Sequence, residues 1–127
     1  MSREERTGNR DLTFSRWHRA LPDFCTCIDL DFLEYCQHCR RPLALIEIAR
    51  GHHGSIKPTT VLRQLAIAAG IRAYLVLYDL DESVASGIKS VVRAQRIEPD
   101  PTNMREMPLS DFGSCIENIH QAHKCKP

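Results

Sequence analysis

Three carboxylates lie inside two stretches that otherwise have the composition of buried strands. Asp29 and Asp31 belong to CIDLDFLEY (27–35), and Glu47 belongs to RPLALIEIA (41–49). An unpaired carboxylate on a buried strand face is costly, because the charge loses its hydration. These acids therefore either face water, where arginines neutralise them, or face a bound cation.

The CQHCRRP link between the two stretches indicates an antiparallel hairpin with a short polar turn. If Cys36 pairs with Pro42, Asp31 lies opposite Glu47, with Cβ atoms about 4.5–5.5 Å apart. Like charges at that separation repel, so Mg²⁺ or Mn²⁺, which prefer carboxylate oxygens, is the expected cofactor. A register shift of one residue would instead move Glu47 to the other face.

The order of motifs resembles the core of the PD-(D/E)XK nuclease superfamily, and more narrowly its small phage-borne or bacterial members. The resemblance covers roughly residues 14–122 and has an acidic hairpin at its centre. The matching pieces are Arg16-Trp17-His18, Asp29-Leu-Asp31-Phe-Leu-Glu34-Tyr35, Pro42-Leu-Ala-Leu-Ile-Glu47-Ile-Ala49-Arg50, the apolar strand Ile71–Tyr78 and the loop from Glu98 to Met107.

This resemblance implies metal-dependent hydrolysis of phosphodiesters in DNA. Asp31 and Glu47 would be the metal-binding carboxylates, and the carbonyl of Ile48 would be a further ligand. Asp29 would sit beside them as a supporting or alternative acid. The metal would lower the pKa of a bound water and polarise the scissile phosphate.

One position departs from the family pattern, because Ala49 stands where the motif has a lysine. That lysine supplies positive charge near the developing anion, and alanine supplies none. Lys57 and Arg63 follow in the chain and could reach back, and Gln64 either lies near the site, as in some relatives, or faces solvent. The alternative to a nuclease is a non-catalytic module on the same fold that binds nucleic acid or a protein.

Cations near the acids are needed for contact with a nucleic-acid backbone, although the chain as a whole has a formal net charge of only +1. Lys89, Arg93 and Arg96 form a second basic stripe, or else protect an edge strand from aggregation. Trp17 is expected in the core. The candidate DNA-binding residues are Arg16, His18, Arg50, Lys57 and Arg63.

Six cysteines offer other metal ligands. A strand between Cys27 and Cys36 would separate them by roughly 30 Å, so the pairs at 25/27 and 36/39 do not share one ion. Cys25 and Cys27 could bind zinc with His52 and His53, but zinc is not the expected cofactor. Cys36 and Cys39 are interpreted as free thiols or a redox pair in the turn, Cys115 as a small core residue and Cys125 as an exposed tail residue.

The length of 127 residues suits one domain, and no apolar run approaches the roughly 20 residues of a membrane span. The polar N-terminus lacks a signal-peptide core, which predicts the cytoplasm of a prokaryote or of a phage-infected host. DNA is the predicted partner, a membrane is not, and a homodimer is left open.

The pattern predicts a disordered tail at 1–12 and a single nuclease-like α/β domain at 13–123. Its elements are a short helix from Thr13, the hairpin, a helix at 59–70, a buried strand at 71–80, an edge strand at 88–97 and a last helix capped by Ser110. Strand, helix and strand in this order form a β-α-β crossover. The fold class is thus α/β, a mixed sheet flanked by helices, as in a restriction-endonuclease-like core.

Overall fold

The computed structural model describes residues 11–51 and 59–125, so the first ten residues of the expected disordered tail lie outside it. The described chain forms three helices and five strands. In chain order they are α1 (Thr13–Arg19), β1 (Phe32–Tyr35), β2 (Pro42–Arg50), α2 (Thr60–Ala69), β3 (Arg72–Tyr78), β4 (Val91–Glu98), β5 (Arg105–Pro108) and α3 (Leu109–Ala122).

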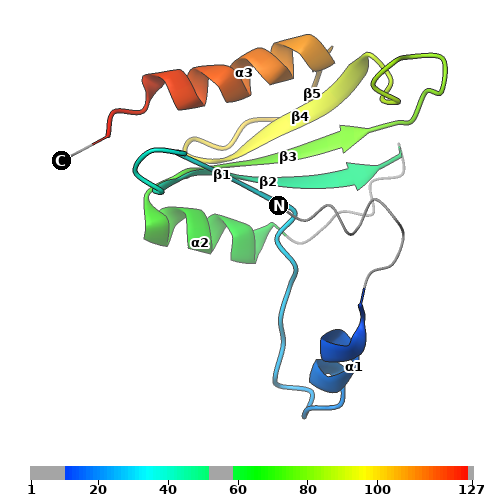
Figure 1. The fold of residues 1–127 in the computed structure, drawn as a ribbon, viewed down its shortest axis with the longest axis vertical. Helices are drawn as coiled ribbons and strands as arrows, with labels where there is room; N and C mark the ends of the chain where they lie inside the picture. The colour runs from blue at the N-terminus through cyan, green and yellow to red at the C-terminus, as the bar shows by residue number, and fades with distance from the viewer. Residues whose placement is uncertain (1–10, 52–58, 126–127) are drawn as a thin grey trace.

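The five strands form one mixed sheet in the order β1-β2-β3-β4-β5 (Figure 1). β1 and β2 are antiparallel, and β2 is parallel to β3 through the α2 crossover. β4 and β5 then continue antiparallel. The hairpin and the β-α-β crossover predicted from the sequence are therefore confirmed.

Each face of the sheet is covered by one helix, α2 on one side and α3 on the other (Figure 1). The apolar core accordingly has two parts, because side chains alternate between the faces of a strand. Leu45 of β2 packs with Leu62 and Ala66 of α2, whereas Ile46 packs on the other face with Phe112 of α3. The acid Glu47 follows the same alternation and points to the α2 face.

Two predicted features of the C-terminal half are wrong. β4 is an interior strand, because the segment expected to be a loop supplies β5 as its second neighbour. The charges of β4 are tolerated there because they remain half-buried rather than enclosed. The last helix begins at Leu109 after Pro108, without a side-chain cap from Ser110.

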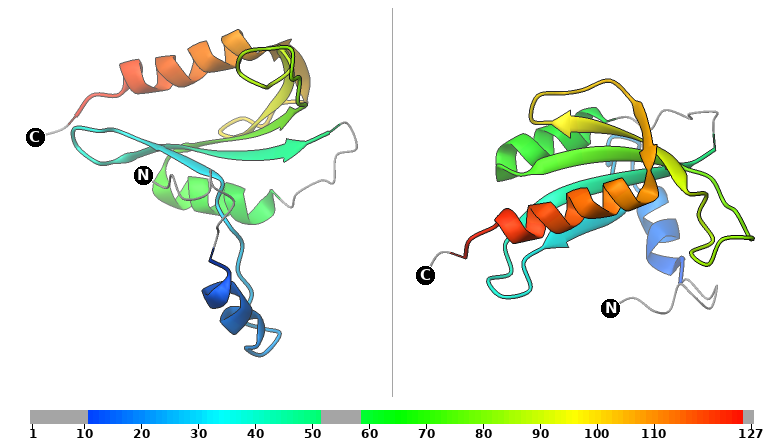
Figure 2. Two further views of the ribbon diagram at one scale, coloured as in Figure 1. Left: turned by 45° about the vertical axis from the view of Figure 1, so that its right-hand side comes forward. Right: turned by 90° about the horizontal axis from the view of Figure 1, so that it is seen from above.

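The N-terminal region extends away from the sheet instead of packing on it. α1 stands apart and is joined to β1 by an extended segment (Figure 2). No residue of α1, which is described in full, is buried, and Trp17 is 56% exposed, so its predicted core position is wrong. β1 begins only at Phe32, five residues later than the sequence pattern predicts.

Two glycines in the helices should respond to alanine with opposite signs. Gly70 ends α2 with φ +67°, the left-handed conformation that costs an alanine about 1–2 kcal/mol. Gly113 lies inside α3, and a methyl group added to it would meet nothing within 4 Å. Gly70→Ala is therefore expected to destabilise, and Gly113→Ala to stabilise by about 0.5–1 kcal/mol. Urea unfolding measures both, and shifts of the same sign would contradict the assignment.

Candidate metal centres

The first candidate centre is the acid pair on the β1–β2 hairpin. Phe32 pairs with Ile46 and Leu33 with Leu45, which is the predicted register and brings Asp31 beside Glu47. The register shifts nearer the turn, where Tyr35 rather than Cys36 pairs with Pro42. Asp31 and Glu47 therefore lie side by side as predicted, although the residues paired next to the turn differ from the prediction.

Both carboxylates accept hydrogen bonds from the backbone of the opposite segment. The Asp31 N–H donates to Glu47 Oε1 at 3.3 Å, and the Ile48 N–H donates to Asp31 Oδ2 at 2.9 Å. Glu47 is 7% exposed, whereas Asp31 is half-buried. These bonds continue the hairpin where the regular ladder has ended, so the acids have a structural role in addition to any chemistry.

Some of the groups that a nuclease metal site would need lie beside the acid pair, and others do not. Because the N–H and C=O of a strand residue point to the same side, the Ile48 carbonyl faces the Asp31 segment. Asp29 is exposed, and outside β1. Ala49, in the position of the missing lysine, is half-buried and packs against the apolar cluster under α2.

The other predicted catalytic residues are not brought to the acids within the described chain. Gln64 is exposed and lies about 200° around α2 from buried Leu62, so it faces away from the sheet. Arg63 is exposed and forms an ion pair with Glu98 at 3.4 Å. Lys57, like His52 and His53, lies outside the described residues.

The predicted DNA-binding cations fall into separate groups. Arg16 and His18 belong to α1, where Arg19 joins them in the last turn. The His18 Nδ1 lies 3.6 Å from the Cys27 Sγ. Arg50 is exposed at the end of β2. The cations on α1 thus form one basic surface on the extended N-terminal region.

The second candidate centre joins the β1–β2 turn to the C-terminal tail. Cys36 and Cys39 come from the turn, and His123 and Cys125 follow α3. Their ligand atoms all lie within 4.8 Å of one another, and it is the only such group of three or more potential ligands in residues 11–51 and 59–125. The Cys36 and Cys125 sulfurs are 3.5 Å apart, and the Cys39 Sγ lies 3.2 Å from His123 Nε2.

The thiols of this cluster differ in acidity. Backbone hydrogen bonds from Cys39 and His38 lower the pKa of the Cys36 thiol to about 7, because they stabilise its anion. The Cys36 and Cys39 side chains raise the pKa of Cys125 to about 11, because its proton is held between sulfurs. A thiol with a lowered pKa supplies the thiolate more readily, and the thiolate is the form of cysteine that binds a metal.

This cluster corrects the predicted cofactor. Three thiols and an imidazole are typical ligands of zinc and do not suit Mg²⁺ or Mn²⁺, which favour oxygen. The expectation of Mg²⁺ or Mn²⁺ rather than zinc is therefore wrong. The sequence carried the signal as Cys-x-x-Cys at 36–39 and His-x-Cys at 123–125, but the two halves are more than 80 positions apart.

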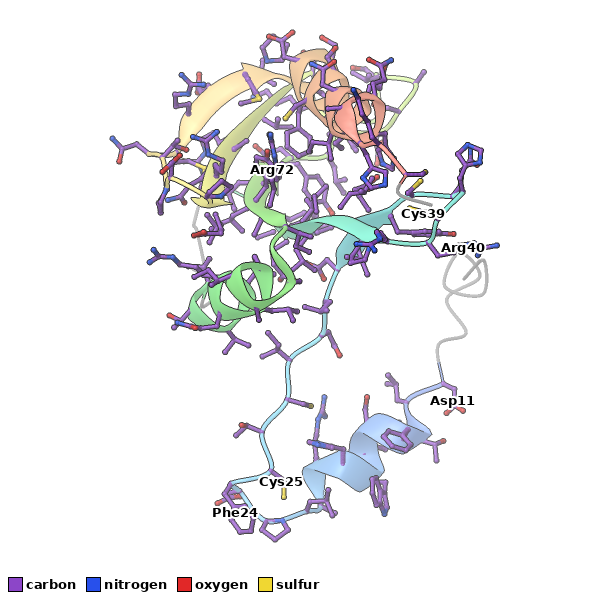
Figure 3. All side chains as sticks on the ribbon, turned by 90° about the vertical axis from the view of Figure 1, so that its left-hand side faces the viewer. Asp11, Phe24, Cys25, Cys39, Arg40 and Arg72 are labelled. Atoms are coloured by element: carbon purple, nitrogen blue, oxygen red, sulfur yellow. The ribbon has the colours of Figure 1, made fainter. Side chains whose placement is uncertain are left out.

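Cys25 lies far from the turn that carries Cys39 (Figure 3), and Cys27 lies beside His18 of α1. The sequence-based exclusion of one site shared by both cysteine pairs therefore agrees with the structure. Cys125 is exposed, as predicted, whereas Cys115 is only half-buried on α3 rather than a core residue.

Comparison of the chain with models of protein families, with curated proteins and with solved structures finds no match. None of the helices in the described part of the chain is long and apolar enough to cross a membrane.

Proposed function

We propose that this chain is a DNA-binding domain built on a nuclease-like α/β core, and that it binds unpaired bases without cutting the strand. The observation that carries the proposal is the surface of α1. Phe14 and Trp17 are 73% and 56% exposed, with ring centroids 5.1 Å apart. Arg16 lies between these rings in the sequence, His18 and Arg19 follow Trp17, and the seven residues of α1 include no acid.

Exposed aromatic rings between cations are the arrangement with which proteins hold single-stranded nucleic acid. Bases stack on the rings whatever their sequence, and cations contact the phosphates. Exposing two large aromatic side chains on a helix that buries none of its residues is unfavourable in the free protein. A stacked base would cover that surface.

The same proposal accounts for the acid pair. The antiparallel hairpin and the parallel β2–β3 crossover support the proposed nuclease-like core. Ala49, however, supplies no positive charge beside Glu47, and both acids accept backbone hydrogen bonds. A retained scaffold with altered chemistry fits these features better than an active nuclease, and we propose a reducing compartment such as the cytoplasm for it.

Substitution of Trp17 by alanine is expected to weaken binding to single-stranded DNA about 5- to 150-fold. This range corresponds to the roughly 1–3 kcal/mol of one stacked base. Fluorescence anisotropy with a labelled oligonucleotide measures the affinity. Trp17 is also the only tryptophan, so its emission should be quenched when the wild-type chain binds.

A matched control is Phe24→Ala, because Phe24 is 84% exposed on the same extended region but lies beyond the basic helix. Its affinity should equal that of the wild type. The double variant R16E/R19E should weaken binding and flatten the salt dependence, since fewer counterions are released. Equal losses from Phe24→Ala and Trp17→Ala would contradict specific stacking, and absence of binding at low salt would overturn the proposal.

Cleavage separates this function from the enzymatic alternative. Single-stranded, duplex and branched DNA should stay intact in the presence of the wild-type chain, with and without added divalent cations. Cleavage that disappears in both Asp31→Ala and Glu47→Ala would establish the nuclease instead. Cleavage that survives both substitutions would indicate a contaminant and leave the binding result to decide.

A further inference from the structure

We propose that Cys36, Cys39, His123 and Cys125 bind one Zn²⁺ ion, which fastens the C-terminal end of α3 to the β1–β2 turn. This inference concerns a different part of the molecule from the DNA-binding surface and does not depend on it. Figure 1 and Figure 2 show the β1–β2 turn and the C-terminal end of α3 at the same end of the sheet.

The distances suit a single tetrahedral ion. With Zn–S bonds of about 2.3 Å and Zn–N bonds of about 2.0 Å, tetrahedral ligands lie roughly 3.5–3.8 Å apart. The pairs at 3.5 Å and 3.2 Å are close to these values, and every other pair lies within 4.8 Å. Small rotations of the side chains would place four donors around one centre.

Backbone hydrogen bonds and one unusual conformation fix the β1–β2 turn that carries Cys36 and Cys39. The Cys36 N–H donates to the Arg41 carbonyl at 2.9 Å, and the Arg40 N–H donates to the Cys36 carbonyl at 2.8 Å. Arg40 has φ +67°, a conformation that a residue with a side chain adopts at a cost. The backbone N–H groups of His38 and Cys39 also point at the Cys36 sulfur. This strained turn aims both of its thiols at the tail.

The ligand count indicates a structural role. Four protein ligands leave no open position for a substrate or an activated water. The only buried residue of α3 in the described chain is Phe112, near the start of the helix. Its far end is held by the contact of His120 Nε2 with Glu34 Oε1 at 2.8 Å and by the cluster beyond it. Zinc would anchor the end of α3 that the core does not.

Elemental analysis of the reduced full-length chain, purified in the presence of zinc, should find one zinc per chain. Replacement by Co²⁺ should give the thiolate charge-transfer and visible bands of a tetrahedral sulfur-rich site. His123→Ala and Cys125→Ser should each weaken zinc binding more than about a hundredfold. That loss exceeds the 10- to 100-fold effect of removing a supporting hydrogen-bond partner.

Matched controls replace the same residue types outside the cluster. His38→Ala removes an exposed imidazole from the same turn, and Cys27→Ser removes an exposed thiol from the N-terminal region. Both should retain one zinc per chain. If a ligand variant fails to fold, the cobalt spectrum of the wild type still reports the number of thiolate ligands.

Three results would overturn the site. The first is a folded wild-type chain that contains no bound zinc after exposure to zinc. The second is a cobalt spectrum without thiolate bands. The third is loss of zinc binding in Cys27→Ser but not in Cys125→Ser, which would place the metal in the N-terminal region instead.

Discussion

Removing zinc from the folded chain is expected to lower its melting temperature by roughly 15 °C. A ligand present at a thousandfold excess over its Kd stabilises the folded state by about 4 kcal/mol. Over 127 residues, an unfolding entropy of about 2.1 cal/mol/K per residue amounts to about 0.27 kcal/mol/K. Division of the free energy by this entropy gives the expected shift.

Circular dichroism with and without a strong chelator measures this difference, and added zinc should restore the original value. Hydrogen exchange should show the loss first at the end of α3, because Phe112 holds its start in the core. Cys27→Ser should respond to chelation like the wild type. A melting temperature that chelation does not change would show that the cluster contributes no metal-dependent stability.

Leu45→Ala is expected to destabilise the domain by about 2–5 kcal/mol, because it opens a cavity beneath α2. Leu45 is 1% exposed and packs with Leu62 and Ala66. Its cross-strand partner Leu33 faces the same side of the sheet but is 48% exposed at the edge. Leu33→Ala should therefore cost less than about 1 kcal/mol.

Denaturant unfolding of the two variants compares the same substitution, leucine to alanine, at a buried and at an exposed position of one strand pair. The midpoint should fall steeply for Leu45→Ala and little for Leu33→Ala, with unchanged slopes. Equal losses would mean that β1 is covered in solution, as it would be in the homodimer that the sequence left open.

Local patterns in the sequence were sufficient to predict the centre of the fold. The apolar runs around Leu45 and in β3 specified strands, and Gly70 specified the end of α2. The register that places Asp31 beside Glu47 was also predicted, although the shift between Glu34 and Tyr35 next to the turn was not. These features depend on residues that are close together in the sequence, or on the one short turn that joins β1 to β2.

Other features depended on contacts that local patterns do not contain. β5 is only four residues long, so its own sequence carries little strand signal. It forms by pairing with the edge that β4 presents. Trp17 suggested a core position by its chemistry, yet the extended segment keeps α1 away from the sheet. The cysteine cluster could not be predicted from local patterns, because it forms only where the tail after α3 returns to the β1–β2 turn.

The proposed zinc would also divide the chain topologically. A bridge between Cys36 and Cys125, which lie 89 positions apart, encloses β2 to β5, α2 and α3 in one closed loop. Of the described elements, α1, the extended segment and β1 remain outside it. A protease cut inside the loop would leave two fragments held together by the metal, whereas a cut before β1 would release the basic helix alone.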